Sequence, residues 1–324
     1  MSDCDVLRAR AEIVRAIRKF FDDQGFVEVE TAVRIAAPAP EEHIDCPPVV
    51  GGGYLRASPE LQMKKLLAAG MDKIYQIGPC FRDGEFGSRH RPEFTMIEWY
   101  RRGANYLDIK RDLEGLLGGE FVESSESSES SNQSNNRRID ESSNSPTGKM
   151  PVAPGKNRPI HCPPPPSLST SLSTLFVRDA YREYAGWDPW TDWDQDRFDF
   201  DMATKIEPAI KAMGGGVFLM DYPPQAASLS KLRGDVAERW EFYYDGIELA
   251  NCFTELCDCD EQAARFANAK AARQNLGEAD YPIDKAFLET LPRIGSAAGV
   301  ALGVDRLVMV LTGAKDIGSV RADE

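Results

Sequence analysis

The stretch FRDGEFGSRHRPEFTMIEWYR, from Phe81 to Arg101, decides the fold of this chain and indicates its chemistry. Four arginines and one histidine surround a short polar turn, Asp83-Gly84-Glu85. The chain then enters an alternating, strand-like segment with Glu98 near its centre. Cations beside a chain reversal suit a polyanion such as a nucleoside triphosphate, because guanidinium groups bind phosphate oxygens well. The alternative is a solvated hairpin tip with scattered charges.

Strand alternation puts Glu98 on the same face as Phe94, Met96 and Tyr100. A buried carboxylate without a cation costs several kcal/mol or becomes protonated. Glu98 therefore requires a cationic partner unless its face lies outside the core. An internal arginine or lysine and the ammonium group of a ligand both satisfy this requirement, and the residues alone do not choose between them.

A second carboxylate-rich stretch, WEFYYDGIELANCFTE, runs from Trp240 to Glu255. Alternation places Asn251 and Glu255 on one strand face and Glu248 out of phase with them. If Glu248 serves the same cavity, a bulge or bend must lie between them. Carboxylates near triphosphate-binding arginines commonly hold Mg²⁺, and internal salt bridges are the alternative.

The stretch GVALGVDRLVMVL, residues 299–311, predicts a small-residue strand followed by a helix capped by Asp305 and ending near Gly313. Glycines 299 and 303 let another group approach the backbone closely. Arg306 falls in the first helical turn, where the helix dipole disfavours a cation by about 0.3–1 kcal/mol. An arginine at a helix start is a good anion site, and pairing with Asp305 or another acid is the alternative.

Local signals predict the remaining elements. Apolar residues at helical spacing predict a helix over residues 3–24, stopped by Gly25. Ser58 is expected to cap another helix, with Pro59 as the first helical residue and Glu60 in the first turn. Further strands are expected at residues 27–29, 94–99 and 246–256.

Composition limits the class of protein. The chain has 324 residues, of which 42% are hydrophobic, enough for one large or two ordinary domains. A net charge of −14 argues against a general nucleic-acid binder, which needs a basic face. Seven cysteines at irregular spacing predict the reduced cytoplasm rather than a disulfide framework. We expect neither a membrane span nor a secretory signal.

One internal segment has a different composition. Residues 124–145 contain ten serines and residues 146–166 contain eight prolines. Such a sequence cannot bury enough apolar surface to offset its ordering entropy, about 1–2 kcal/mol per residue. We therefore predict that residues 119–174 are a disordered Ser/Pro-rich insertion in a single catalytic domain formed by residues 1–118 and 175–324.

Together, these stretches resemble the class II aminoacyl-tRNA synthetases of the lysyl type. The opening stretch is similar to motif 2, GVALGVDRLVM to motif 3 and RKFFDDQGFVEVET to motif 1. SPELQMKKLL and GIELANCFTEL are similar to lysine-pocket segments. The resemblance covers residues 5–117 and 175–324. It implies an α+β fold with a mainly antiparallel sheet flanked by helices, and a homodimer formed through the motif 1 region.

Within that superfamily, the chain is most similar to stand-alone ligases that attach (R)-β-lysine to elongation factor P. Few residues precede the first predicted helix, so we expect no anticodon-binding domain and no tRNA partner. Ala301 stands where the synthetase pattern has glycine. The resemblance implies ATP, Mg²⁺, (R)-β-lysine and elongation factor P as the reactants and partners. The alternatives are activation of α-lysine for another acceptor, an inactive regulatory paralogue, and an ammonia-using amide synthetase.

The resemblance also implies residue roles. Arg82 and Arg306 are expected to be catalytic, by positioning ATP and neutralising its charge. Glu241 and Glu248 are expected to bind Mg²⁺. The ATP-binding set is Arg82, Glu85, His90, Phe94, Glu241, Glu248 and Arg306. The substrate-binding set is Glu60, Glu98, Tyr100, Asn251, Glu255 and Ala301.

The sequence departs from the family pattern at four positions. Ala32 replaces a proline of motif 1, next to the expected dimer contact. Gly84 replaces a motif 2 glutamate, and Glu85 is expected to take over its contact with adenine. Arg91 replaces an asparagine and Cys252 a glycine. None of these changes removes a phosphate-binding arginine or a magnesium carboxylate, so we expect an active enzyme.

Overall fold

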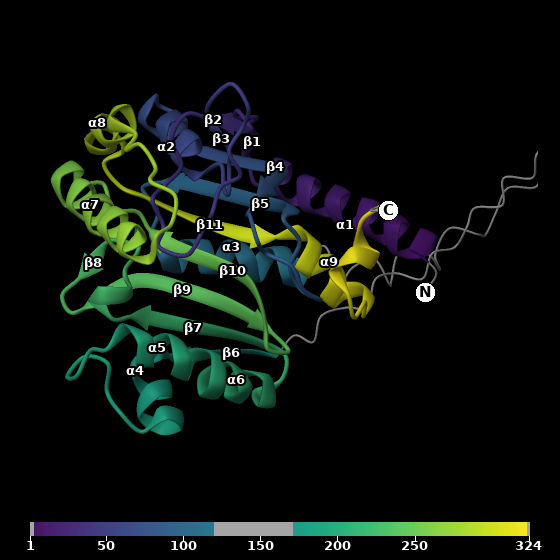
Figure 1. Cartoon of the computed structure of the whole chain (residues 1–324). Helices are drawn as coiled ribbons and strands as arrows, with labels where there is room; N and C mark the ends of the chain where they lie inside the picture. The colour runs from purple at the N-terminus through teal and green to yellow at the C-terminus, as the bar shows by residue number, and fades with distance from the viewer. Residues whose placement is uncertain (1–2, 120–170, 323–324) are drawn as a thin grey trace, which may run out of the picture.

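A computed structural model describes residues 3–119 and 171–322 and shows one large mixed sheet with helices on both faces (Figure 1). The strand order is β1-β4-β5-β11-β10-β9-β7-β6, with β8 paired to β9. The β1–β4 and β6–β7 pairs are parallel and all other pairs of this sheet are antiparallel, which confirms the predicted α+β class. Its strands are β1 (Val27–Glu28), β4 (Lys73–Phe81), β5 (Glu93–Arg102), β6 (Leu172–Phe176), β7 (Gly216–Tyr222), β8 (Leu232–Arg233), β9 (Val236–Tyr244), β10 (Ile247–Thr254) and β11 (Ala297–Gly303); β2 (Arg34–Ile35) and β3 (Tyr54–Leu55) form a separate pair.

The helices divide between the two faces of the sheet. Helices α1, α3 and α9 share one apolar core with Trp99 of β5 and Trp240 of β9. The first helix ends one residue before its predicted boundary, ahead of Gly25, which has a left-handed φ of 74° as a helix stop requires. The helices are α1 (Asp3–Asp23), α2 (Glu60–Ala68), α3 (Tyr106–Gly119), α4 (Val177–Ala180), α5 (Gln195–Asp201), α6 (Glu207–Met213), α7 (Cys259–Leu276), α8 (Lys285–Ile294) and α9 (Val304–Thr312), with short π- or 3₁₀-helical turns η2 (Tyr181–Ala185), η3 (Met202–Ile206), η4 (Pro224–Ala226) and η5 (Ile317–Val320).

The opposite face of the sheet is bordered by two groups of helices. Helices α2, α7 and α8 pack together near one end, and α4–α6 pack beside β7 and β9 (Figure 1). Alternation in β5 sends Ile97 and Trp99 into the core with α1, while Met96 and Glu98 face the other side. This confirms the two faces predicted for the strand. The central strands on this second face are left open between the helix groups.

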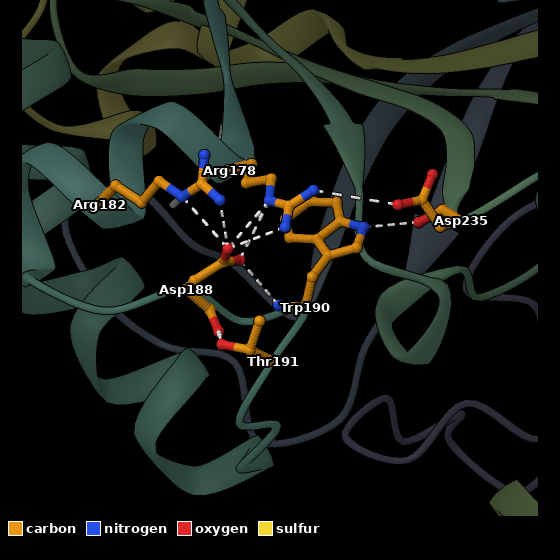
Figure 2. A network of polar contacts seen from close by, with 6 residues as sticks. All are labelled: Arg178, Arg182, Asp188, Trp190, Thr191 and Asp235. Atoms are coloured by element: carbon orange, nitrogen blue, oxygen red, sulfur yellow. Dashed lines mark hydrogen bonds and ion pairs between the residues drawn. The ribbon is translucent and has the colours of Figure 1, made fainter.

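A polar network joins α4 and η2 to the loop that follows them (Figure 2). Asp188 accepts hydrogen bonds from Nη2 of Arg178 at 2.9 Å and Nη2 of Arg182 at 2.6 Å. Trp190 donates through Nε1 to the backbone oxygen of Asp235 at 2.5 Å. The network ties α4 and the loop after η2 to the β8–β9 turn.

Two helix starts differ from the predictions. Pro59 is the N-cap of α2 rather than its first helical residue, and the Ser58 hydroxyl accepts a hydrogen bond from the Glu60 amide at 3.0 Å. Gly303, not Asp305, is the N-cap of α9. The Asp305 carboxylate instead pairs with Arg10 of α1 at 2.5 Å, so a distant partner takes the side chain away from the capping position.

The predicted insertion lies mostly outside the described residues. At its edges, the structure places Gly119 at the end of α3 and residues 172–174 in β6, paired with β7. The boundary predicted at residue 174 is therefore too late, because the strand starts at Leu172. Among the described helices, none has both the length and the apolar character that crossing a membrane requires.

Candidate active site

One row of side chains crosses the open face of the sheet. Glu241 of β9 pairs with Asn251 of β10, Asn251 with Ala301 of β11, and Ala301 with Glu98 of β5. Directly paired residues lie side by side on one face, so this row forms the floor of a cavity. The cavity has a volume of about 330 Å³. Every predicted site residue lines it: Glu60, Arg82, Glu85, His90, Phe94, Glu98, Tyr100, Glu241, Glu248, Asn251, Glu255, Ala301 and Arg306.

A β-bulge brings Glu248 into this cavity. The register shifts so that Glu248 pairs with Tyr243 whereas Ala250 pairs with Phe242, leaving one extra residue in β10. The bulge predicted between Glu248 and Asn251 is confirmed. Since an extra residue reverses the alternation, Glu248 lies on the same face as Glu241 despite its sequence phase.

Arg306 and His90 meet at one end of the cavity. The Arg306 guanidinium donates through Nη1 to the backbone oxygen of Glu248 at 2.9 Å, and its Nη2 lies 2.7 Å from His90 Nε2. Loss of solvent, followed by the charge of Arg306, lowers the pKa of His90. Near pH 7 the ring is therefore neutral. Its Nε2 accepts from Arg306, which leaves an N–H at Nδ1 for a ligand.

Arg82 lines the same cavity. Its guanidinium lies 5.2 Å from the centre of the Phe94 ring, and Nη1 lies 3.5 Å from Oε1 of Glu85. Two buried polar atoms on the cavity wall, Nε of Arg82 and Oδ1 of Asn251, have no hydrogen-bond partner among the described residues. Buried polar groups are normally paired, so these atoms point to a polar ligand.

Glu241 and Glu248 have the donor chemistry that a divalent cation requires. Glu241 accepts from Arg239 at 2.5 Å and from the Tyr243 hydroxyl at 2.7 Å. Burial, followed by the charge of Glu241, raises the pKa of Glu248. A cation between the two carboxylates would relieve that repulsion. No group of three or more metal-ligating side chains occurs in residues 3–119 and 171–322, so phosphate oxygens and water would complete the shell of Mg²⁺.

Lys64 is a functional residue that the sequence interpretation missed. Its ammonium group lies 2.5 Å from Oε1 of Glu60 and also pairs with Glu255. The side chain is buried, and although burial alone would lower the pKa of Lys64, the charges of Glu255 and Glu60 raise it. Lys64 is thus an internal cation shared by two predicted pocket acids. The signal was available, because Glu60 and Lys64 are four residues apart on a predicted helix.

Glu98 lies at the same end and has no such partner. It accepts hydrogen bonds from Ser58 at 2.5 Å and from Tyr100 at 2.8 Å, and it is only 1% exposed. Burial, followed by the charge of Glu60, raises the pKa of Glu98 to about 7. No described lysine or arginine forms an ion pair with it. Lys64 attracts Glu98 from beyond ion-pair distance, so the internal cation that the sequence left open is nearby but not in contact with it.

Gly299 allows the Tyr100 ring to lie directly against β11. A Cβ atom at position 299 would come within 2.1 Å of that ring, far closer than van der Waals contact allows. Tyr100 can therefore take this position, from which its hydroxyl reaches Glu98, only beside a glycine.

Known proteins resemble this chain over nearly its whole length. The family model described as tRNA synthetases class II (D, K and N) matches residues 3–322. The elongation factor P–(R)-β-lysine ligase of Proteus mirabilis (strain HI4320) is 35% identical over 98% of this chain and 94% of its own length. Proteins with the same name from Yersinia enterocolitica and Vibrio cholerae are 35% and 34% identical over the same shares. This chain belongs to the class II tRNA synthetases of the D, K and N type.

Proposed function

We propose that the protein is an ATP-dependent ligase that activates (R)-β-lysine as an adenylate and transfers it to a lysine ε-amine of elongation factor P. The observation that carries this proposal is one cavity in which Arg306 and His90 meet beside Glu248, while the buried carboxylates of Glu98 and Glu255 lie among Ser58, Tyr100 and Lys64. Such a cavity is complementary to a triphosphate joined to a diamino acid. The names of the relatives support this substrate and acceptor.

The first step forms the adenylate. The substrate carboxylate attacks the α-phosphorus of ATP, a P–O bond forms, and pyrophosphate leaves. Arg82 neutralises charge on the α-phosphate and holds the carboxylate, while Arg306 and the Nδ1–H of His90 bind the distal phosphates. Phe94 offers its ring to adenine and Glu85 accepts from the adenine amine. Positioning and charge neutralisation supply the catalysis, and no covalent nucleophile is needed.

The second step transfers the acyl group. The unprotonated lysine ε-amine of elongation factor P attacks the adenylate carbonyl, an amide bond forms, and AMP leaves.

Glu241 and Glu248 would hold Mg²⁺ against the phosphates during activation. When bound, Mg²⁺ supplies positive charge to phosphate oxygens that develop negative charge.

The amine end of the cavity favours a doubly cationic substrate. Glu98 is ready to pair with an ammonium group, and Asn251 offers an unpaired oxygen. Ala301 lies between these two residues in the sheet, so its methyl group fills the position where a glycine would leave space. This shape supports (R)-β-lysine, whose ammonium group is one carbon farther from the carboxylate than that of α-lysine.

The remaining alternatives have less support. Retention of Arg82, Glu248 and Arg306 in one cavity argues against an inactive paralogue. The names of the relatives do not favour α-lysine with another acceptor, or ammonia. We further propose that the acceptor is a protein rather than tRNA. The enzyme is proposed to work in the cytoplasm, where ATP and translation factors meet.

The protein is also proposed to act as a homodimer through α1 and β1. The edge strand β1 exposes Val27, a residue that is 51% exposed in the single chain. An apolar side chain on an edge strand suits contact with a second copy. Light scattering coupled to gel filtration should give twice the mass of one chain, and a single-chain mass contradicts the dimer.

The decisive experiment is ATP–pyrophosphate exchange with (R)-β-lysine and with α-lysine, followed by mass spectrometry of elongation factor P incubated with the protein. We expect faster exchange with the β-isomer and a mass increase of one β-lysyl group on elongation factor P. No exchange with either isomer would refute the proposed activity. Equal rates with both isomers would refute the role given to Ala301.

A further inference from the structure

Arg91 departs from the family pattern, which has an asparagine at this position. It follows an exposed turn, residues 87–90, in which Gly87 and His90 form an isolated β-bridge. Nη1 of Arg91 donates to the backbone oxygens of Gly87 at 2.6 Å and His90 at 3.1 Å, and its Nη2 donates to Oδ1 of Asp316 at 2.9 Å. One guanidinium group therefore closes both ends of the turn and ties the turn to the C-terminal segment.

The C-terminal segment is a firm support for this turn. Asp316 precedes η5, and its Oδ1 also accepts from the Gly318 amide at 2.8 Å, so the carboxylate is held in place independently of Arg91. Ile317 is buried in the core that η5 shares with α1 and α9. Its amide donates to the backbone oxygen of Ser88, inside the turn, at 2.9 Å. A buried element thus supports an exposed one at two points.

On its other side, the turn contacts Arg306. Nε of Arg306 donates to the backbone oxygen of Arg89 at 3.3 Å, and its Nη2 lies 2.7 Å from Nε2 of His90. Residues 86–90 are all exposed, so few buried contacts fix this backbone and its order depends on hydrogen bonds. Loss of the Arg91 contacts would leave the turn, and His90 with it, free to move away from Arg306.

Gly318 provides the space for this arrangement. A Cβ atom at position 318 would come within 2.6 Å of Nη2 of Arg91 and 3.1 Å of Oδ1 of Asp316. Because the nearest atom is the end of a flexible side chain, an alanine at position 318 would push the guanidinium group aside and leave the backbone in place. The contact between Arg91 and Asp316 therefore depends on the glycine.

We propose that Arg91 is a positioning residue that holds the exposed turn in place so that His90 and Arg306 meet at the distal phosphates of ATP. It acts through Asp316, which anchors the turn to η5. This inference rests on the proposed function and deepens it by assigning a residue that orders the ATP-binding loop without touching ATP. Arg91 is not itself the phosphate ligand, since its charge is paired with Asp316 and both of its terminal nitrogens already donate.

The test is a double-mutant cycle of Arg91→Gln and Asp316→Ala in the full-length protein. Calorimetry measures the binding of ATP with Mg²⁺, and ATP–pyrophosphate exchange with (R)-β-lysine measures the kinetics. Each single substitution should weaken ATP binding and raise the KM for ATP by about three- to tenfold, while kcat and the KM for (R)-β-lysine change by less than about twofold. The double variant should be no worse than Arg91→Gln, because both substitutions break the same contact. Arg91→Lys should recover only part of the affinity, since an ammonium group lacks the planar fork that binds several oxygens at once.

Gly318→Ala is an independent test, because it keeps both charges. It should raise the KM for ATP by itself and have less than about a twofold effect when combined with Arg91→Gln, whose shorter side chain no longer meets the added methyl group. Arg102→Gln is the matched control. The side chains of Arg102 and Arg91 are 33% and 32% exposed, but Arg102 pairs with Asp72 at the far end of β5 and does not line the cavity. Its substitution should leave ATP binding unchanged, and thermal melting should show that all variants are folded.

Unchanged ATP binding in either single variant overturns the proposal; if only Arg91→Gln loses affinity, Arg91 touches the phosphates directly. Additive losses in the double variant, or an equal loss from Gly318→Ala with and without Arg91, overturn it as well. If ATP binds but neither lysine isomer supports exchange, the proposed activity fails, and the calorimetric cycle still decides on Arg91. No binding of ATP to the unsubstituted protein overturns both.

Discussion

The two ends of the cavity hold their charged side chains at different depths, one partly exposed to solvent and the other buried. In the proposed reaction, the phosphate end gathers Arg82, Arg306 and the neutral His90 in partly or fully exposed positions, where solvent reaches both guanidinium groups. The amine end buries Glu98 and Glu255 almost completely. A partly exposed cation needs no fixed partner, whereas a buried carboxylate needs one, either inside the protein or on the ligand.

The need of buried carboxylates for a fixed partner explains the position of Lys64. At the phosphate end, ATP can be attracted by cations that water already stabilises. At the amine end, too many acids would oppose folding before the substrate arrives. The internal ammonium group of Lys64 pairs with two of them, Glu60 and Glu255. Each prediction below tests one side of this comparison.

Replacing Lys64 with methionine should have the largest effect. The substitution leaves Glu60 and Glu255 without their shared cation, and breaking a buried pair costs about 3–5 kcal/mol. Urea unfolding should show this loss. Lys65→Met is the control, since Lys65 pairs with Asp284 in a partly exposed position and should cost at most about 1 kcal/mol. Similar losses in the two variants would contradict the buried-pair interpretation.

Arg306→Ala should nearly abolish exchange while the protein remains folded. Removing one charged donor from a catalytic site typically slows a reaction by about 10²–10³-fold. Here the substitution also releases His90 and Glu248 from their contacts. Arg293→Ala, at an exposed position on α8, should keep full activity. If Arg306→Ala retains more than about a tenth of the exchange rate, Arg306 does not bind the phosphates of ATP.

Glu248→Gln should raise the Mg²⁺ concentration needed for half-maximal exchange by about 10-fold or more, because one of two carboxylates is lost. The variant should bind free β-lysine normally, since Glu248 lies at the phosphate end. A magnesium titration of exchange, paired with calorimetry of the amino acid, measures both effects. An unchanged magnesium requirement would exclude Glu248 as a ligand.

The amine end should respond to pH near neutrality. Because the pKa of Glu98 is raised to about 7, its ionised fraction rises about tenfold between about pH 6 and about pH 8. The affinity for ε-aminocaproate, which carries a single ammonium group, should rise in parallel and level off above that range. Glu98→Gln should remove the slope, whereas Glu42→Gln, outside the cavity, should keep it. If the affinity of Glu98→Gln still rises between about pH 6 and about pH 8, another titrating group causes the pH dependence.

The same raised pKa of Glu98 makes the free energy of unfolding fall, rather than rise, as the pH increases. The unfolded carboxyl group ionises near its ordinary value of 4.5, whereas the folded one stays protonated up to about pH 7. Stability from Glu98 is therefore complete below about pH 4.5 and is lost as pH rises to about 7. Glu98→Gln should melt at a higher temperature than the unsubstituted protein at about pH 8, in the absence of substrate.

Sequence periodicity predicted the parts of the site that lie on regular strands. Alternation gave the faces of β5, and the phase of Glu248 against Asn251 required the bulge that the structure contains. These predictions succeeded because side-chain direction in a strand follows local geometry. The convergence of separate stretches into one cavity came from the family resemblance, since spacing alone does not bring β5 beside β11.

Partners distant in sequence escaped prediction. Asp305 was expected to cap its own helix, but Arg10 of α1 takes its carboxylate. Glu41 lies in an irregular connection, where no period indicates which side chain faces the cavity. Lys64 was within reach of a local rule, but its second partner, Glu255, lies just after β10, on the segment that leads to α7. Long-range electrostatic pairing is decided by the whole fold.

The contact between Gly299 and Tyr100 limits how this pocket can be re-engineered. Any side chain introduced at position 299 would displace the aromatic ring that holds Glu98 in place. Mutant libraries aimed at new amino acids should therefore leave position 299 unchanged and begin at position 301, whose methyl group lines the same wall. Two small residues on the same face of β11 therefore tolerate change differently. Gly299 must stay a glycine because the Tyr100 ring packs against it, whereas the side chain at position 301 can be varied to change which amino acids the pocket accepts.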